Sequence, residues 1–191
     1  MYKSTKTYKG LQGLLLISFL LGVSAVAVAD IHYFVQMRVN ANETDLVIKT
    51  QKGDAGGCSG FSRKKGCVRA NVNDDIKVSF LLAGNSKCDA TEGGEWRFKD
   101  VTLGGLDGSS KPSAWGGFAT GDKVDKDFKF LNPATGVLAP ETKSDRQLTI
   151  RDKNQSEYIV WYKVTAECVD AGDKVYKEIT TDPRIENKGT I

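Results

Sequence analysis

The sequence predicts an all-β protein built as a mostly antiparallel sandwich of about eight short strands. Apolar and polar residues alternate in several short segments, which is the period of a strand with one buried face. Gly, Asn and Asp separate these segments. No segment keeps a helical period over a helical length, so we expect no helices crossing between parallel strands. A closed barrel is the alternative arrangement.

The clearest strand lies near the C-terminus, over residues 158–168. Lys163, Thr165 and Glu167 share one parity, and the apolar residues share the other. A turn at 170–173 follows, and residues 175–180 return as the second strand of a hairpin. The inward residues are Tyr158, Val160, Tyr162, Val164, Ala166 and Cys168. We therefore expect this segment to be a core strand.

The other strands follow from the same pattern in chain order. Alternation or a short apolar run predicts strands at 31–39, 46–48, 68–72, 76–82, 96–103, 128–130 and 148–150. In the fifth of these segments the apolar parity switches near Lys99-Asp100, which predicts a β-bulge. Residues 104–121 are rich in Gly and small residues, so we expect a long surface loop there, and a second loop at 132–144.

The N-terminal residues have the features of an export signal. Lys3, Lys6 and Lys9 form a basic region, residues 14–23 form an apolar region, and small residues at 27–29 form a cleavage site. We expect a signal peptide at 1–29, a single sandwich domain at 30–191, and a periplasmic or secreted protein. The apolar run is too short and interrupted for a stable membrane span.

The charge balance excludes a general attraction to polyanions. The three lysines of the leader account for the whole positive excess, and the mature part carries 24 basic against 24 acidic residues. A protein without a basic surplus lacks the electrostatic footprint of nucleic-acid binding, so no nucleic-acid partner is expected.

The four cysteines are Cys58, Cys67, Cys88 and Cys168, and all of them follow the leader. An even number in an exported chain predicts two disulfides, although four cysteines allow three connectivities. We favour Cys58 with Cys67, which closes a short loop. The second pair, Cys88 with Cys168, would then join a mid-chain loop to the late strand.

The C-terminal part resembles a known group of proteins. Tyr162-Lys163-Val164, a turn near Gly172, and Asp182-Pro183-Arg184-Ile185 resemble the ending of small bacterial immunoglobulin-like sandwich proteins called the DP-EP family. Bacterial inclusion-body proteins have a similar ending. The Glu-Pro pair of the family name has no counterpart, because Glu186 is followed by Asn187. The resemblance implies an immunoglobulin-like topology, and it implies no activity and no functional residues.

Two surface features are candidates for ligand binding. Arg63, Lys64 and Lys65 lie in the expected Cys58–Cys67 loop and could present three cations to an anionic glycan, a lipid headgroup or a protein partner. A solvated charged loop would have the same sequence. Trp115 and Phe118 flank two glycines and could stack on sugar rings, or fold back and cover one end of the sandwich.

A histidine near the expected mature N-terminus is a candidate metal ligand. Cleavage after Ala29 would place His32 third from a free amine. The amine, two amide nitrogens and one imidazole nitrogen could then form a square-planar site for Cu(II) or Ni(II). The histidine also falls on the polar side of the first predicted strand, where ladder pairing would occupy the same amides.

Catalysis has little support in the sequence. There is one histidine, the cysteines are expected to be bridged, and no nucleophile elbow, phosphate loop or zinc motif is present. We therefore expect an exported, non-enzymatic binding or structural module that needs no cofactor. The alternatives are a hydrolase of exported polymers that uses paired carboxylates and the N-terminal copper or nickel binder.

Overall fold

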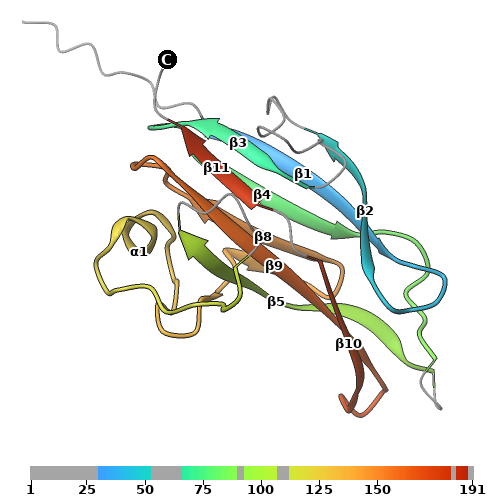
Figure 1. The fold of residues 1–191 in the computed structure, drawn as a ribbon. Helices are drawn as coiled ribbons and strands as arrows, with labels where there is room; N and C mark the ends of the chain where they lie inside the picture. Colours follow the sequence, from blue (N-terminus) through green and yellow to red (C-terminus); the bar gives the residue numbers. More distant parts are fainter. Residues whose placement is uncertain (1–29, 53–65, 90–92, 107–111, 182–183, 189–191) are drawn as a thin grey trace, which may run out of the picture.

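The computed structural model describes residues 30–52, 66–89, 93–106, 112–181 and 184–188, and these residues form two β-sheets (Figure 1). The all-β prediction is confirmed. The first sheet contains, in spatial order, β2 (Leu46–Lys52), β1 (Asp30–Val39), β4 (Asp75–Leu82), β8 (Gln147–Asp152) and β7 (Thr142–Lys143). The second contains β3 (Val68–Asn71), β11 (Arg184–Lys188), β9 (Tyr158–Val169), β5 (Glu95–Leu106) and β6 (Val137–Leu138), with β10 (Val175–Thr181) also paired to β9.

Strand β9 is the centre of the second sheet, as its alternation predicts. Along one edge it pairs with β5, from Glu95 opposite Val169 to Leu106 opposite Val160. Along its other edge, β10 pairs with the C-terminal half of β9 and β11 pairs with the N-terminal half. The two late strands therefore follow one another along the same edge of β9.

The antiparallel prediction holds for most pairs and fails for two. β1 lies parallel to β4, and β11 lies parallel to β3. Parallel neighbours need a crossover connection, which is usually a helix. Between β1 and β4 the chain instead passes through β2 of the same sheet and β3 of the opposite sheet. The crossover therefore consists of strands. The sequence prediction excluded helical crossovers, and it did not exclude a crossover of this kind.

The inner faces of the two sheets form one hydrophobic core. Its buried residues come from both sheets and include Tyr33, Phe80, Trp96, Phe98 and Tyr162. The rings of Phe80 and Tyr162 join the sheets, with centroids 5.3 Å apart. The Tyr162 hydroxyl donates to the Gly66 carbonyl, and burial raises the pKa of this phenol well above its usual value.

The predicted bulge in β5 is confirmed, because the register against β9 shifts between Phe98 and Asp100. The boundary predicted at residue 103 is wrong. β5 continues through Gly104 and Gly105 to Leu106, with a second register shift after Gly104. Gly105 has a φ of 63°, a conformation that favours glycine, so the residues that suggest a loop here form a bulge.

The strand predicted at 128–130 is wrong. A short helix, α1 (Lys123–Asp127), ends at Phe128, which caps it and makes one isolated bridge with Asp152. Phe130 has a φ of 67° and is 58% exposed, so it belongs to a turn. The strand count also rises from about eight to eleven in the described part of the chain. β6 and β7 have two residues each, too few to show alternation.

The predicted long-range disulfide is confirmed. Cys88 in the connection between β4 and β5 is bonded to Cys168 near the end of β9, with Cα atoms 6.0 Å apart. Cys67 is also disulfide-bonded, and Cys58, its expected partner, lies outside the described residues.

The expected signal peptide at 1–29 lies outside the described residues as well. In the part of the chain that the structure describes, no helix is long and apolar enough to cross a membrane.

Candidate ligand-binding cleft

A tight turn between β1 and β2 forms one wall of a cleft at the disulfide end of the sandwich. Asn40 organises this turn: its Oδ1 accepts the N–H groups of Thr44 (2.8 Å) and Asp45 (3.2 Å), and its Nδ2 donates to Thr44 Oγ1 (2.8 Å). Such side-chain to backbone bonds are the reason that Asn favours turns. Glu43 sits in the left-handed region at a φ of 52° and is held there by this network.

The connection between β4 and β5 forms the opposite wall. The Ala83 N–H donates to the Met37 carbonyl (2.7 Å), and the Trp96 N–H donates to the Ser86 carbonyl (2.6 Å). The Cys88–Cys168 disulfide ties the middle of this connection to β9. The described part of the wall is therefore held by backbone hydrogen bonds and by one covalent bond.

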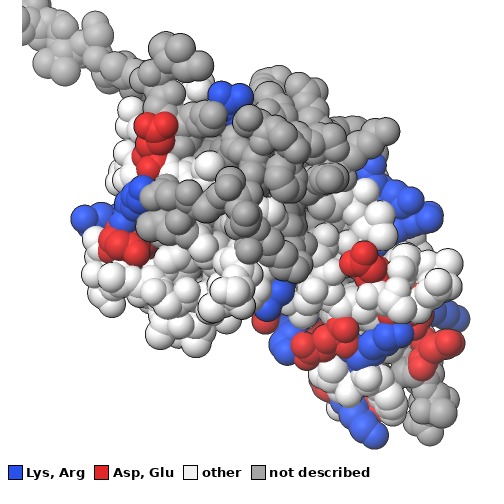
Figure 2. All heavy atoms as spheres, viewed as in Figure 1, with Lys and Arg blue, Asp and Glu red and all other residues white. Residues whose placement is uncertain are grey.

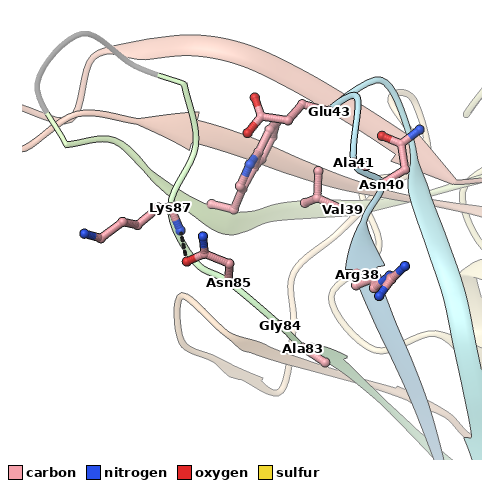
Figure 3. A pocket seen from close by; sticks show the side chains of 10 residues that line it. Arg38, Val39, Asn40, Ala41, Glu43, Ala83, Gly84, Asn85 and Lys87 are labelled. Carbon is pink, nitrogen blue, oxygen red and sulfur yellow. Dashed lines mark hydrogen bonds between the residues drawn. The ribbon is translucent and has the colours of Figure 1, made fainter.

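The cleft between these walls has a volume of about 330 Å³ and is open to solvent. That volume is at the lower end of the range for small-ligand sites. Figure 3 shows Glu43 above the cleft, Asn85 on the facing wall, and Arg38 and Lys87 at two different sides of it. The lining residues are Arg38, Val39, Asn40, Ala41, Glu43, Ala83, Gly84, Asn85, Lys87 and Trp96.

Trp96 places an unsatisfied donor beside this cleft. Its side chain is 1% exposed and packs in the hydrophobic core. Its Nε1 is buried and has no hydrogen-bond partner in the described part of the chain. A buried donor without a partner costs about 1–3 kcal/mol, and buried Trp N–H groups usually have one. Trp96 is also among the residues that line the cleft, so a molecule bound there would lie next to this side chain.

The cationic side chains that line the cleft form no ion pairs with described residues, whereas cations on the neighbouring surface do. Figure 2 shows basic and acidic side chains close together at the end of the molecule that carries β10. Ion pairs join residues of β5 to residues of β9, β10 and the turn between these two strands: Arg97 pairs with Glu167 (2.8 Å) and Asp173 (2.5 Å), and Lys99 pairs with Glu178 (2.5 Å). Arg38 and Lys87 make no ion pair with any described residue. The cleft therefore has two cations available for a ligand.

The predicted aromatic candidates, Trp115 and Phe118, lie elsewhere and cover the sandwich. A Cβ added to Gly104 on β5 would lie 2.7 Å from Trp115 Cε3, so the indole lies against the strand at that point. The Lys163 ammonium lies over the indole, 5.0 Å from the ring centroid. Phe118 is partly buried and packs against the core. The structure places both residues in the fold-back arrangement that the sequence left open.

His32 is part of a hydrogen-bonded chain on the outer side of the first sheet. Its Nε2 lies 2.8 Å from Ser79 Oγ, which lies 2.7 Å from Thr149 Oγ1. Residues 30–32 are registered with 75–77 of β4 in a parallel ladder. A square-planar metal site would require the amides of residues 31 and 32 to be free of this pairing. Ser79 is fully buried, so this histidine and serine do not present an accessible nucleophile.

Two acidic residues at the helix α1, Asp122 and Asp127, have structural partners. Asp122 caps α1 by accepting the Asp125 N–H (3.0 Å). Asp127 is buried and accepts the N–H groups of Gln155 (3.0 Å) and Ser156 (3.1 Å). Burial raises the pKa of the Asp127 carboxyl against the opposing effect of these hydrogen bonds. Among the described residues, no three His, Cys, Asp or Glu side chains form a group able to hold a metal ion.

Arg63, Lys64 and Lys65, the predicted cationic ligand candidates, lie outside the described residues. The residues that line the cleft were missed by sequence reasoning. Trp96 was predicted only as the first residue of a strand. Arg38 and Glu43 lie around the β1–β2 turn and Asn85 lies in the β4–β5 connection, and only the fold brings these segments together. One signal was present in the sequence, because a buried tryptophan near the end of a strand needs an acceptor for its N–H.

Comparison with known proteins gives little further information. No protein family and no curated protein matches the chain. Among solved structures, the chain is similar to the inclusion body protein PixA from Burkholderia cenocepacia J2315, at 12% identity and a TM-score of 0.40. That match covers 86% of this chain and 98% of the other.

Proposed function

We propose that this protein is an exported, non-enzymatic module that binds a glycan in the cleft beside Trp96. The observation that carries the proposal is the open, polar cleft of about 330 Å³ that Trp96 lines together with several polar side chains. Sugars carry many hydroxyl groups, which both donate and accept hydrogen bonds. The cleft also provides the Glu43 carboxylate, which can accept hydrogen bonds from hydroxyl groups, and the Asn85 amide, which can donate hydrogen bonds to them.

We further propose that the two sheets have an immunoglobulin-like topology and that the protein acts in the periplasm or outside the cell. The mostly antiparallel sheets and the Cys88–Cys168 disulfide support this view. Disulfides persist mainly in oxidising compartments. The N-terminal sequence pattern supports the same compartment.

The proposal does not include hydrolysis. Glycoside hydrolysis requires two carboxyl groups on either side of the bond that is cleaved. Glu43 is the single carboxylate that lines the cleft among the described residues. On a neighbouring surface, Asp173 is engaged with Arg97, and Asp170 accepts the backbone N–H groups of Gly172 and Lys174.

The indole N–H signals in NMR spectra test the proposal directly. The chain has three tryptophans, so ¹⁵N-labelled mature protein should give three indole peaks, which Trp→Phe variants assign. We would titrate soluble oligosaccharides that include neutral, acidic and amino sugars. We expect one of them to shift the Trp96 peak and to leave the Trp115 peak in place. No shift of the Trp96 peak with any sugar would overturn the proposal, and a shift of the Trp115 peak alone would move the site to the covering loop.

A further inference from the structure

We infer that the cleft is specific for a sugar that carries a carboxylate, such as a uronic acid unit. The inference rests on the proposed function and adds the chemical class of the ligand. It is carried by the balance between hydrogen-bond donors and acceptors among the side chains that line the cleft.

The donors come from both walls of the cleft. Arg38 at the end of β1 and Lys87 in the β4–β5 connection carry positive charges and make no ion pair with any described residue. Asn85 uses its Oδ1 to accept the Lys87 backbone N–H (3.1 Å), so its Nδ2 remains to donate. Each of these groups can donate a hydrogen bond to an oxygen of a ligand.

The acceptors are fewer. The Asn40 side chain lines the cleft, but its oxygen and its nitrogen are both used inside the turn. Glu43 is the remaining side-chain acceptor, and its contact with the Asp89 N–H is long at 3.5 Å. A neutral sugar presents donors and acceptors in similar numbers and would leave part of this donor set without partners. A ligand with an extra acceptor group that is negatively charged matches it better.

The type of cation favours a carboxylate. A guanidinium binds the two oxygens of a carboxylate in one plane, and such charge-assisted bonds are stronger than neutral ones. Lys87 lies at the rim, where Figure 3 shows its side chain directed away from the centre of the cleft, and its flexible stem lets it approach a bound anion. Glu43 opposes one of the two positive charges and can accept hydrogen bonds from the sugar hydroxyls. The site therefore matches one negative charge next to several hydroxyl groups.

The test compares acidic and neutral oligosaccharides of the same linkage. We would measure the binding of tri-galacturonate and of the matching galactose trimer to the mature protein by calorimetry, with the Trp96 indole peak as a second readout. We expect the acidic trimer to bind at least about tenfold more tightly at low salt, and the preference to fall in high salt because ions screen the exposed charges. The Arg38→Gln variant should lose most of the preference, while Lys49→Gln, which changes an exposed cation outside the cleft, should keep it.

Four outcomes separate the two proposals. A preference for the acidic trimer that disappears in Arg38→Gln supports the inference. Equal binding of both trimers at Trp96 would overturn the inference and leave the proposed function standing. If neither trimer binds while an amino sugar shifts the Trp96 peak, the inference again fails alone, whereas no Trp96 shift with any sugar overturns both.

Discussion

At the scale of single residues, the structure assigns several unusual side chains to specific tasks. Asn40 and Asp122 each accept backbone N–H groups, at a turn and at a helix N-cap. Asp127 is a carboxylate in the interior, where burial raises its pKa. Asp75 is the opposite case, because its hydrogen bonds to Arg151 lower the pKa of the Asp75 carboxyl. The contributions of Asp127 and Asp75 to the free energy of unfolding should therefore change with pH in opposite directions.

The Asp127→Asn substitution tests the buried carboxylate. An amide nitrogen would face one of the N–H donors of Gln155 and Ser156, so we expect a loss of about 1–3 kcal/mol in the free energy of unfolding at pH 4. In the wild type, the folded-state pKa of Asp127 is raised above 3.8, so its stabilising contribution is present below that value and is lost as pH rises through the folded pKa. The difference between wild type and variant should therefore shrink from pH 4 to pH 7 in urea denaturation.

The Asp75→Asn variant is the matched control. The folded-state pKa of Asp75 is lowered, so its contribution is present above 3.8 and is lost as pH falls through the folded pKa. The effect should be below about 1 kcal/mol because the pair with Arg151 is partly exposed. A difference from wild type that grows with pH for Asp127→Asn would contradict the assignment.

The Gly104→Ala substitution tests the close approach of Trp115. The added Cβ would lie 2.7 Å from Trp115 Cε3, so the indole must move away from the strand. We expect a loss of about 1–3 kcal/mol in stability and a change in tryptophan fluorescence. Gly172→Ala is the control, because its Cβ would lie 3.3 Å from its nearest neighbour, Asp170 Oδ1. Equal effects of the two substitutions would mean that the indole does not lie on Gly104.

At the scale of elements, short pieces of structure depend on local caps and bulges. The helix α1 has five residues, and a helix of this length is not stable by itself. Its N-terminus is closed by Asp122, and Asp125 Oδ2 in turn accepts the Gly121 N–H (2.7 Å). The strand β5 keeps its pairing with β9 over its whole length by means of two register shifts.

The Asp122→Ala substitution tests the cap of α1. Loss of an Asp at the N-cap removes the acceptor for the Asp125 N–H and typically costs about 1 kcal/mol. We expect a loss of this size in thermal or urea denaturation. The Asp122→Asn variant keeps a side-chain oxygen and should stay within a few tenths of a kcal/mol of wild type. If both variants are equally destabilised, the charge of Asp122 matters more than its hydrogen bond.

At the scale of the whole molecule, one disulfide connects parts of the chain that are 80 residues apart. It joins the wall of the cleft to the central strand β9, so the stability of the fold and the shape of the cleft depend on the same bond. In the chain-entropy model, a cross-link that closes a loop of this length contributes roughly 4 to 5 kcal/mol.

The double variant Cys88→Ala with Cys168→Ala tests this connection. We expect the free energy of unfolding to fall by roughly 4 kcal/mol, because the unfolded chain regains the freedom that the bond removes. Urea denaturation of both proteins, fitted with separate slopes, measures the difference. Any glycan that shifts the Trp96 indole peak should also bind more weakly to the variant. A stability change below about 1 kcal/mol would show that the backbone hydrogen bonds alone fix the connection.

The sequence by itself determined the all-β class, the strands with clear alternation and the bulge near Lys99-Asp100. It favoured the pairing of Cys88 with Cys168 among three connectivities, and the structure shows that pairing. The strands and the bulge follow from local periodicity, and the disulfide follows from the fact that only cysteines form this bond. The tertiary structure decided the parallel pairs, the helix before Phe128 and the strand through Gly104, because each depends on contacts between distant segments. The cleft also depends on such contacts. Arg38, Asn85 and Trp96 meet there because the β1–β2 turn and the β4–β5 connection lie at the same end of the two sheets.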